Sequence, residues 1–204
     1  MPAALQVAVV DSGVANLASV LAALRRIGAE AEVTADPARI EKAERVILPG
    51  VGAAAAAMAQ LRRKNLHGLL PKLMQPVLGI CLGMQLLFAR SFEGKTEPIQ
   101  CLEIFSGDIR LIPAMPGMPV PHMGWNRLKP LQPEHPLLRG VADGDYAYFV
   151  HSYAAAPDDA AIATSDYGAP FSAIAARRNF FGCQFHPERS GAVGRRILEN
   201  FMRI

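Results

Sequence analysis

The chain has 204 residues, of which 51% are hydrophobic and 19% are charged, and its formal net charge is only +3. These values are typical of a soluble globular enzyme, and without a long basic run we expect no nucleic-acid partner. The longest apolar stretch, residues 76–89, is too short and too rich in glycine to cross a bilayer, which needs about 20 residues. We therefore expect no membrane partner.

The cysteines and the first residues of the chain give an expectation for the cellular compartment of the protein. Cys81, Cys101 and Cys183 are odd in number and lack paired spacing, which favours a reducing compartment over a disulfide framework. Residues 1–13 have neither a basic leader nor a long apolar core, so we expect no signal peptide and a cytoplasmic location. We find no repeat, and the length suits one domain over residues 1–204.

In the first half of the chain, short apolar runs alternate with segments of helical periodicity. Strands are predicted at residues 5–10, 31–34, 45–48 and 76–80, and helices at residues 14–27, 53–63 and 82–90. Such alternation implies right-handed crossovers and a parallel sheet that is covered by helices on both faces. The predicted fold class is therefore α/β.

The second half has a different texture. Prolines and glycines cluster at residues 113–121, and a final helix is predicted from about Ser190 onward. Between them, short strands are predicted at residues 146–152, 161–164, 171–176 and 180–185. These strands could extend the same sheet in antiparallel fashion, or form a mixed layer on it.

A cysteine flanked by glycines stands at the corner between the fourth predicted strand and the next helix. Gly79 and Gly83 lie two residues on either side of Cys81, which is the arrangement of a nucleophile elbow. The amino end of the helix favours a thiolate and can stabilise an oxyanion. A buried structural cysteine is the alternative, and glycines at both required offsets make it the weaker one.

A nucleophilic cysteine needs a base, and the base needs a group that orients it. His186 ends an apolar run, Pro187 stops the strand, and Glu188 can turn back to the imidazole. A lone histidine is more often a structural residue, but this triplet in a chain with a cysteine elbow is more specific. Cys183 alternates away from His186 on the strand and is expected in the core.

Two other motifs resemble cofactor-binding or metal-binding sites, but each lacks a residue pattern that such a site needs. Residues 50–55 fit a dinucleotide-binding loop, but no acidic residue occurs between Glu44 and Glu93, where that fold needs one. The triplet at residues 186–188 resembles the H-x-E of zinc deaminases, but the C-x-x-C that they require does not occur. We therefore predict no metal and no cofactor.

Several blocks of the sequence resemble a known family. The runs GICLGMQ (residues 79–85) and FHPE (residues 185–188) resemble the triad-type, class I glutamine amidotransferases. A narrower resemblance, to the glutaminase subunits of imidazole glycerol phosphate synthases in histidine biosynthesis, depends on further blocks at residues 11–17, 48–52, 121–126, 148–153 and 184–191. The resemblance implies a single-domain class I glutamine amidotransferase fold with a mostly parallel sheet.

The resemblance also implies roles for individual residues. Cys81 would attack the side-chain amide of glutamine, His186 would transfer the proton, and Glu188 would orient His186. The oxyanion would be met by the backbone N–H of Leu82 and by an N–H of the loop at Gly50 and Val51. Five residues would hold glutamine: Gly50, Gly52, Gln85, Ser152 and Tyr153. For Gln85, an amide on the helix surface is the alternative.

The family passes its ammonia to a (β/α)8-barrel cyclase subunit in a heterodimer. Asn16, Met123, Trp125 and Arg189 would face that partner. For Met123 and Trp125 the alternative is ordinary core packing, and for Arg189 it is a solvated arginine. Three residues depart from the family pattern, namely Ser12, Ala15 and Arg189, which puts the geometry of the interface in question.

Three competing functions remain open on sequence alone. The chain could be the glutaminase of another pathway, which differs in the synthase that captures the ammonia. It could be a cysteine hydrolase of peptides with the same elbow, which would not need Gln85. It could also be a binding subunit without catalysis, although a complete Cys81, His186 and Glu188 set argues against this.

Overall fold

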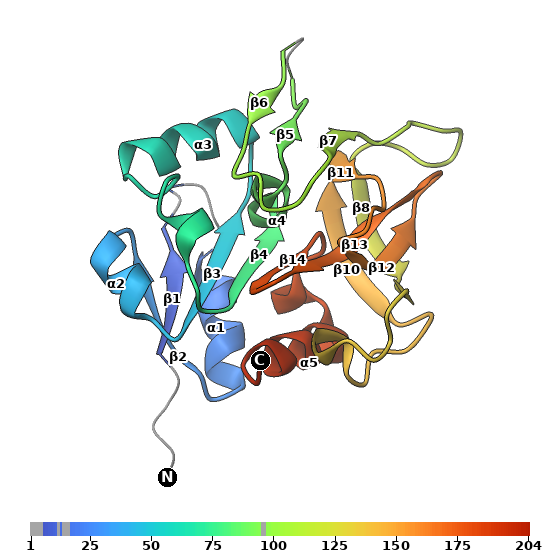
Figure 1. The fold of residues 1–204 in the computed structure, drawn as a ribbon. Helices are drawn as coiled ribbons and strands as arrows, with labels where there is room; N and C mark the ends of the chain where they lie inside the picture. Colours follow the sequence, from blue (N-terminus) through green and yellow to red (C-terminus); the bar gives the residue numbers. More distant parts are fainter. Residues whose placement is uncertain (1–5, 12, 14–16, 95–96) are drawn as a thin grey trace.

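A central eight-stranded sheet organises the molecule (Figure 1). The computed structural model describes residues 6–11, 13, 17–94 and 97–204. The strand order is β2-β1-β3-β4-β14-β13-β12-β9. The parallel part comprises β1 (Gln6–Val10), β2 (Glu30–Thr34), β3 (Arg45–Gly50), β4 (Val77–Cys81) and β14 (Phe180–Cys183). The antiparallel part comprises β13 (Pro170–Arg177), β12 (Ala161–Asp166) and β9 (Lys129–Pro130).

Helices cover both faces of the parallel strands, and the alternation of side chains along each strand explains why. In β1, Val7 and Val9 pack into the same core cluster as the buried side chains of α1 (Leu17–Arg26) and α5 (Gly191–Phe201). Ala8 and Val10 point the other way, into the cluster with α2 (Pro37–Lys42), α3 (Ala54–Arg63) and α4 (Leu82–Leu87). Strands that are apolar on both faces therefore lie in the middle of the sandwich.

The remaining strands form two smaller sheets. β8 (His122–Arg127) pairs with β10 (Tyr146–His151) in antiparallel fashion. The other sheet has the order β11-β7-β5-β6, from Tyr153–Ala155, Asp108–Leu111, Arg90–Ser91 and Ile99–Gln100. Each expectation for the second half applies in part: β12 and β13 extend the main sheet in antiparallel fashion, whereas the predicted strand at residues 146–152 belongs to a separate layer. The strand predicted at residues 180–185 instead runs parallel to β4, so the antiparallel expectation was wrong for it. Short 3₁₀ turns are η1 (Leu70–Lys72), η2 (Pro136–Leu138) and η3 (Pro187–Arg189).

Most predicted boundaries differ from the structure by one or two residues, and three of the differences concern the site. The helix predicted at residues 82–90 ends at Leu87, because the carbonyls of residues 86–89 accept hydrogen bonds from the backbone of residues 101–105 instead of continuing the helix. The strand predicted at residues 45–48 continues to Gly50, where it still pairs with Cys81. The strand predicted at residues 180–185 ends at Cys183. The first residues of the predicted strand 5–10 and helix 14–27 lie outside the described part.

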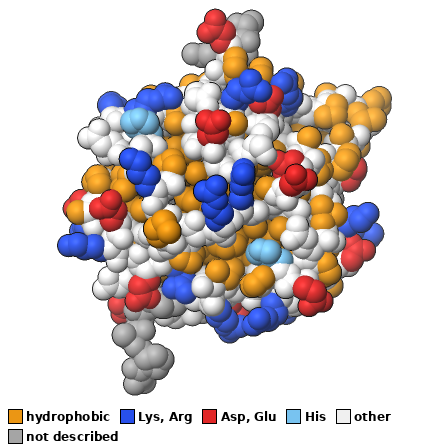
Figure 2. Space-filling model, in the orientation of Figure 1, with side chains coloured by type: hydrophobic (Ala, Val, Ile, Leu, Met, Phe, Trp, Pro, Cys, Tyr) orange, Lys and Arg blue, Asp and Glu red, His pale blue; other side chains and the backbone are white. Residues whose placement is uncertain are grey.

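The surface seen in Figure 2 mixes charges of both signs. Hydrophobic side chains gather there over the loop after β7, which contains the exposed Met115. Within the described residues, no helix has the length and the apolar character needed to cross a membrane.

The turn between β4 and α4 depends on glycine. A Cβ atom on Gly83 would lie 1.7 Å from the carbonyl oxygen of Leu48 in β3, and one on Gly79 would lie 2.7 Å from the backbone of Gly83. These contacts involve backbone atoms, so no side-chain rotation could relieve them. α4 can therefore start directly against β3 only because both positions lack a side chain.

We expect Gly83→Ala to lower the free energy of unfolding by about 3 kcal/mol, because β3 and α4 must move apart. Gly68→Ala is the matched control, since a Cβ there meets nothing within 4 Å, and it should change stability by less than about 0.5 kcal/mol. Urea denaturation of both variants measures the difference. Equal stability of the two variants would contradict the packing described for the elbow.

Candidate active site

Cys81 lies at the carboxyl end of β4 with an unusual backbone. Its φ is 52° and its ψ is −110°, and only 7% of the residue is exposed. The Sγ atom lies 3.7 Å from the carbonyl oxygen of Val150, and the Nε2 atom of Gln184 lies 3.9 Å from Sγ. A non-glycine residue with positive φ at a strand-to-helix corner is the conformation predicted for a nucleophile elbow.

Sheet pairing brings His186 to the same edge as Cys81. β14 runs parallel to β4, with Cys183 opposite Ile80, so the residues that follow both strands meet at the carboxyl edge of the sheet. The Nδ1 atom of His186 lies 2.8 Å from Oε1 of Glu188, whose side chain is only 3% exposed. The backbone N–H of His186 donates to the carbonyl of Tyr148, which fixes the main chain here.

The environment of His186 favours the imidazolium. Burial by itself lowers the pKa of His186, but hydrogen bonds to Cys81 and Glu188 and their negative charges outweigh burial and raise the pKa to about 10. An imidazolium held between a sulfur and a carboxylate can stabilise negative charge on the sulfur and can donate a proton to a leaving group.

The surroundings of the other two cysteines disfavour a thiolate. Both Cys101 and Cys183 are buried and free. Burial raises the pKa of the Cys101 thiol to about 11, and burial raises the pKa of Cys183 still further. Neither is poised as a nucleophile, and Cys183 lies in the core as expected.

A cleft of about 270 Å³ opens above Cys81 and His186. The residues that line it come from distant segments of the chain. Some of them were predicted as site residues from the sequence, and others were not. Its lining comprises Val51, Gly52, Cys81, Leu82, Gln85, Glu93, Pro121, Val150, His151, Ser152, Tyr153 and His186.

The predicted oxyanion donors come from two places: Gly50 and Val51 from the end of β3, which pairs with β4 on the side opposite β14, and Leu82 from the start of α4. Gly50 is the register partner of Cys81, and a Cβ on Gly50 would lie 3.0 Å from the backbone nitrogen of Gly83. Val51 is 39% exposed and Gly52 has a φ of 86°, so the chain turns sharply after β3. Leu82 begins α4, where a backbone N–H has no acceptor within the helix.

Gln85 is buried, so the alternative of a surface amide was wrong. Its Nε2 atom donates to the carbonyl of Tyr153 at 2.8 Å and to Oε1 of Gln184 at 3.1 Å. α4 is buried at every position, because segments from both halves of the chain cover it. The side chain of Gln85 therefore contributes to the wall of the cleft through contacts with the protein itself.

Sequence reasoning missed Glu93 and His151. Glu93 lines the cleft, and its Oε2 atom accepts a hydrogen bond from the backbone N–H of Ala54. One signal was available: Glu93 is the first acidic residue after the elbow, at the end of a run from Glu44 that has none. His151 lines the cleft next to Ser152 and Tyr153, and its burial depends on the pairing of β10 with β8.

The described residues that were predicted to face a partner lie on β8 and on η3. Met123 and Trp125 alternate outward on β8 and are 63% and 55% exposed, so the core-packing alternative was wrong for both. The Trp125 ring packs edge-on against Tyr148, with centroids 5.7 Å apart. Arg189 is exposed on η3. Asn16, Ser12 and Ala15 lie outside the described residues.

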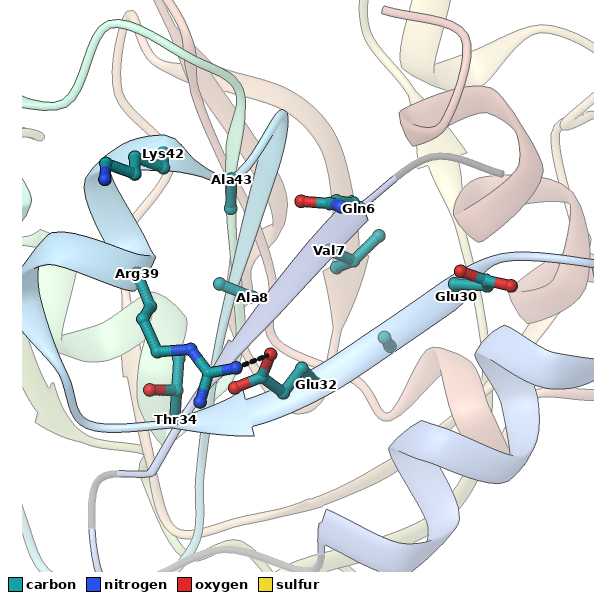
Figure 3. Close-up of a pocket in the computed structure, with 10 residues that line it drawn as sticks. Gln6, Val7, Ala8, Glu30, Glu32, Thr34, Arg39, Lys42 and Ala43 are labelled. Carbon is teal, nitrogen blue, oxygen red and sulfur yellow. Dashed lines mark hydrogen bonds and ion pairs between the residues drawn. The ribbon is translucent and has the colours of Figure 1, made fainter. Parts of the chain in front are cut away.

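A larger hollow lies elsewhere on the described molecule (Figure 3). Its volume is about 400 Å³, and β1, β2 and α2 form its walls. Its lining has neither cysteine nor histidine, and Glu32 is already paired with Arg39 at 2.7 Å. We therefore place the chemistry at the smaller cleft. Among the residues that the structure describes, no group of His, Cys, Asp and Glu is arranged to hold a metal ion.

Comparisons with known proteins agree with this geometry. Residues 8–204 match the family described as glutamine amidotransferase class-I. The chain is 50% identical to "Imidazole glycerol phosphate synthase subunit HisH" of Shewanella loihica over 203 residues, covering 96% of this chain and 89% of the relative. It is 48% identical to the HisH subunit of Escherichia coli over 200 residues, covering 98% and 100%.

Solved structures share the fold at low sequence identity. A putative GMP synthase protein from Thermoplasma acidophilum superposes with a TM-score of 0.74 at 20% identity, covering 100% of this chain and 94% of that one. The PurLQS structure from Thermotoga maritima has a TM-score of 0.72 at 17% identity, covering 98% and 99%. With the family match and the near-complete alignment to HisH subunits, the chain belongs to the class I glutamine amidotransferase family, in its group of imidazole glycerol phosphate synthase subunits.

Proposed function

We propose that the chain hydrolyses glutamine to glutamate and ammonia through a cysteine thioester and supplies the ammonia for synthesis of imidazole glycerol phosphate in histidine biosynthesis. The observation that carries the proposal is the strained Cys81 elbow beside the His186–Glu188 pair, in a chain half identical to HisH subunits over nearly its full length. The partner that uses this ammonia would release aminoimidazole carboxamide ribonucleotide as its second product.

The chemistry follows from the positions of three groups. The sulfur of Cys81 attacks the side-chain carbonyl carbon of glutamine, and the carbonyl oxygen becomes an oxyanion. His186 donates its proton to the departing nitrogen, so ammonia leaves and a glutamyl thioester forms. A water molecule then gives a proton to His186, attacks the thioester carbonyl and releases glutamate and the cysteine sulfur.

Backbone N–H groups stabilise the oxyanion in this proposal. Leu82 supplies one from the start of α4, and Val51 supplies the second from the turn after Gly50. Removal of one such donor costs about 10²–10³ in rate in comparable enzymes. The glycines at positions 50 and 52 permit rotation of the peptide plane that carries the second donor.

The rest of glutamine would lie along the cleft. Glu93 is the acidic side chain among the lining residues, so it would pair with the α-ammonium group of the substrate. Gly52, Gln85, Ser152 and Tyr153 form the surrounding wall. A cleft of about 270 Å³ suits a single amino acid better than a peptide, which favours a glutaminase over a peptide hydrolase.

The partner would be a (β/α)8-barrel cyclase subunit in a heterodimer. Met123 and Trp125 expose large apolar side chains on one strand, and such side chains are typical of interface centres. Arg189 lies one residue after Glu188 and could pair with a carboxylate of the partner, in bidentate fashion. Asn16 would also face the cyclase by family resemblance.

We expect Cys81→Ala to abolish glutamine hydrolysis, because the elbow supplies the nucleophile. With the cyclase subunit present, product formation from glutamine should stop, whereas product formation from added ammonia should continue. Cys101→Ala is the control: it should keep glutaminase activity, with a stability loss of about 1–3 kcal/mol. Glutamate release by purified Cys81→Ala would contradict the assignment.

We expect His186→Ala to lose nearly as much activity as Cys81→Ala, and Glu188→Gln to lose less, since an orienting group contributes less than the base. NMR titration should show the pKa of His186 falling from about 10 in Glu188→Gln, because a carboxylate that favours the imidazolium is gone. A greater activity loss in Glu188→Gln than in His186→Ala would show that the roles are misassigned.

The same pair should make stability depend on pH. The folded pKa of His186 lies above its unfolded value of 6.5, so the imidazolium stabilises the folded state below that pH. This contribution is lost as pH rises toward about 10. The destabilisation by Glu188→Gln should therefore shrink over the same range in urea denaturation. A destabilisation that stays constant from pH 6 to pH 10 would contradict the raised pKa.

A further inference from the structure

Two buried histidines outside the proposed triad lie on β8 and β10, and the second of them lines the cleft. His122 of β8 and His151 of β10 are direct cross-strand partners, and only 3% and 6% of them are exposed. The Nδ1 atom of His122 lies 3.1 Å from Nε2 of His151. The Nδ1 atom of His151 lies 3.0 Å from the carbonyl oxygen of Tyr153. On the far side, Nδ2 of Asn126 lies 3.4 Å from Nε2 of His122.

The Tyr153 carbonyl connects this pair to the nucleophile. It accepts a second hydrogen bond from Nε2 of Gln85 at 2.8 Å, and the same Nε2 donates to Oε1 of Gln184 at 3.1 Å. Nε2 of Gln184 lies 3.9 Å from the sulfur of Cys81. A continuous chain of polar contacts therefore runs from β8 through the wall of the cleft to the reacting atom.

Only one set of donors and acceptors satisfies the outer part of this chain. A carbonyl oxygen can only accept, so the Nδ1 atom of His151 must carry its proton. In a neutral ring the Nε2 atom of His151 is then an acceptor, and Nδ1 of His122 must donate to it. Nε2 of His122 is left to accept from Asn126. The orientation of the Asn126 amide agrees, since its Nδ2 also donates to the carbonyl of Asp166 and its Oδ1 accepts from the backbone of Arg127.

The surroundings keep both rings neutral. Burial lowers the pKa of His122 to about 4. Burial, together with the nearby His122 and His186, lowers the pKa of His151 to about 4, against the effect of the Tyr153 carbonyl. A second proton on His151 would set two N–H groups against each other across the 3.1 Å contact with His122, and a second proton on His122 would face the amide N–H of Asn126.

Aromatic packing offers a purely structural explanation for the same residues. The ring of His122 stacks on Tyr167 with centroids 4.0 Å apart and on Phe149 with centroids 5.1 Å apart. Packing alone, however, requires only a flat ring of this size and no particular proton. The two explanations therefore predict opposite effects of substitutions at position 122 on the activity.

We propose that His151 and His122 are positioning residues for glutamine hydrolysis: His151 holds the Tyr153 carbonyl that orients Gln85 and Gln184 beside Cys81, and His122 fixes the tautomer of His151. The inference rests on the proposed glutaminase function. It assigns no contact between either histidine and the reacting atoms. Its physical basis is that hydrogen-bonded groups polarise and hold one another, and that from Asn126 through His122 to His151 every bond points toward the Tyr153 carbonyl.

Matched substitutions separate positioning from packing. His122→Phe keeps the stacked ring but removes the donor to His151, so it should fold stably and lose about 3- to 10-fold in kcat/KM for glutamine, the range for one hydrogen bond. His122→Asn removes the ring but keeps a donor near the position of Nδ1, so it should keep kcat/KM within about 2-fold even where its stability falls. His151→Phe and His151→Asn should show the same contrast.

The opposite pattern, with Phe variants fully active and Asn variants impaired, would overturn the proposal in favour of packing. Equal losses in both variants would overturn it as well. Inactivity of the unsubstituted chain would instead count against the glutaminase function.

A second measurement needs no activity and covers the case of an unfolded variant. NMR with ¹⁵N-labelled histidine should show both His122 and His151 neutral and protonated at Nδ1 from about pH 5 to 9. A proton on Nε2 of either ring, or titration near the ordinary pKa of about 6.5, would overturn the assigned direction of the chain.

Discussion

The backbone of Cys81 is held where an L-residue rarely stays, and most of the site follows from that constraint. A φ of 52° turns the chain from β4 directly into α4, so the side chain leaves the sheet at its carboxyl edge. Such conformations cost about 1–3 kcal/mol and persist only where the surroundings enforce them. Here β3 and β14 pair with β4 on both sides, and Gly83 lies directly against Leu48. β14 then delivers His186 to one side of the sulfur, and β3 delivers Gly50 and Val51 to the other.

The histidines of this region show how the surroundings decide charge. His186 is buried but faces a carboxylate and a sulfur, so its pKa rises to about 10. His122 and His151 are buried against aromatic rings and neutral polar groups, and burial lowers their pKa values to about 4. His186 can therefore carry a proton in catalysis, whereas His122 and His151 keep a fixed pattern of donors and acceptors near neutral pH.

The sequence predicted those parts of the molecule whose signals are local. The parallel α/β half follows from apolar runs alternating with helical periodicity, and the elbow follows from Gly79, Cys81 and Gly83 within five positions. The end of α4 could not be predicted, because the backbone at residues 101–105 competes for the carbonyls of its last turn. His151 and Glu93 reach the cleft through strand pairing and a loop far from the elbow in sequence. Gln85 lines the cleft, but its burial depends on Gln184 and Tyr153, which are distant along the chain and could not be foreseen from the local sequence.

The central claim is that Cys81 alone among the cysteines is presented to a glutamine-sized substrate. Incubation of the chain with a diazo-ketone analogue of glutamine, followed by mass spectrometry of its peptides, tests this most directly. We predict a covalent label on Cys81, with Cys101 and Cys183 unmodified and with protection by excess glutamine. A label on Cys101 or Cys183, or an active chain whose Cys81 stays unlabelled, would contradict the claim.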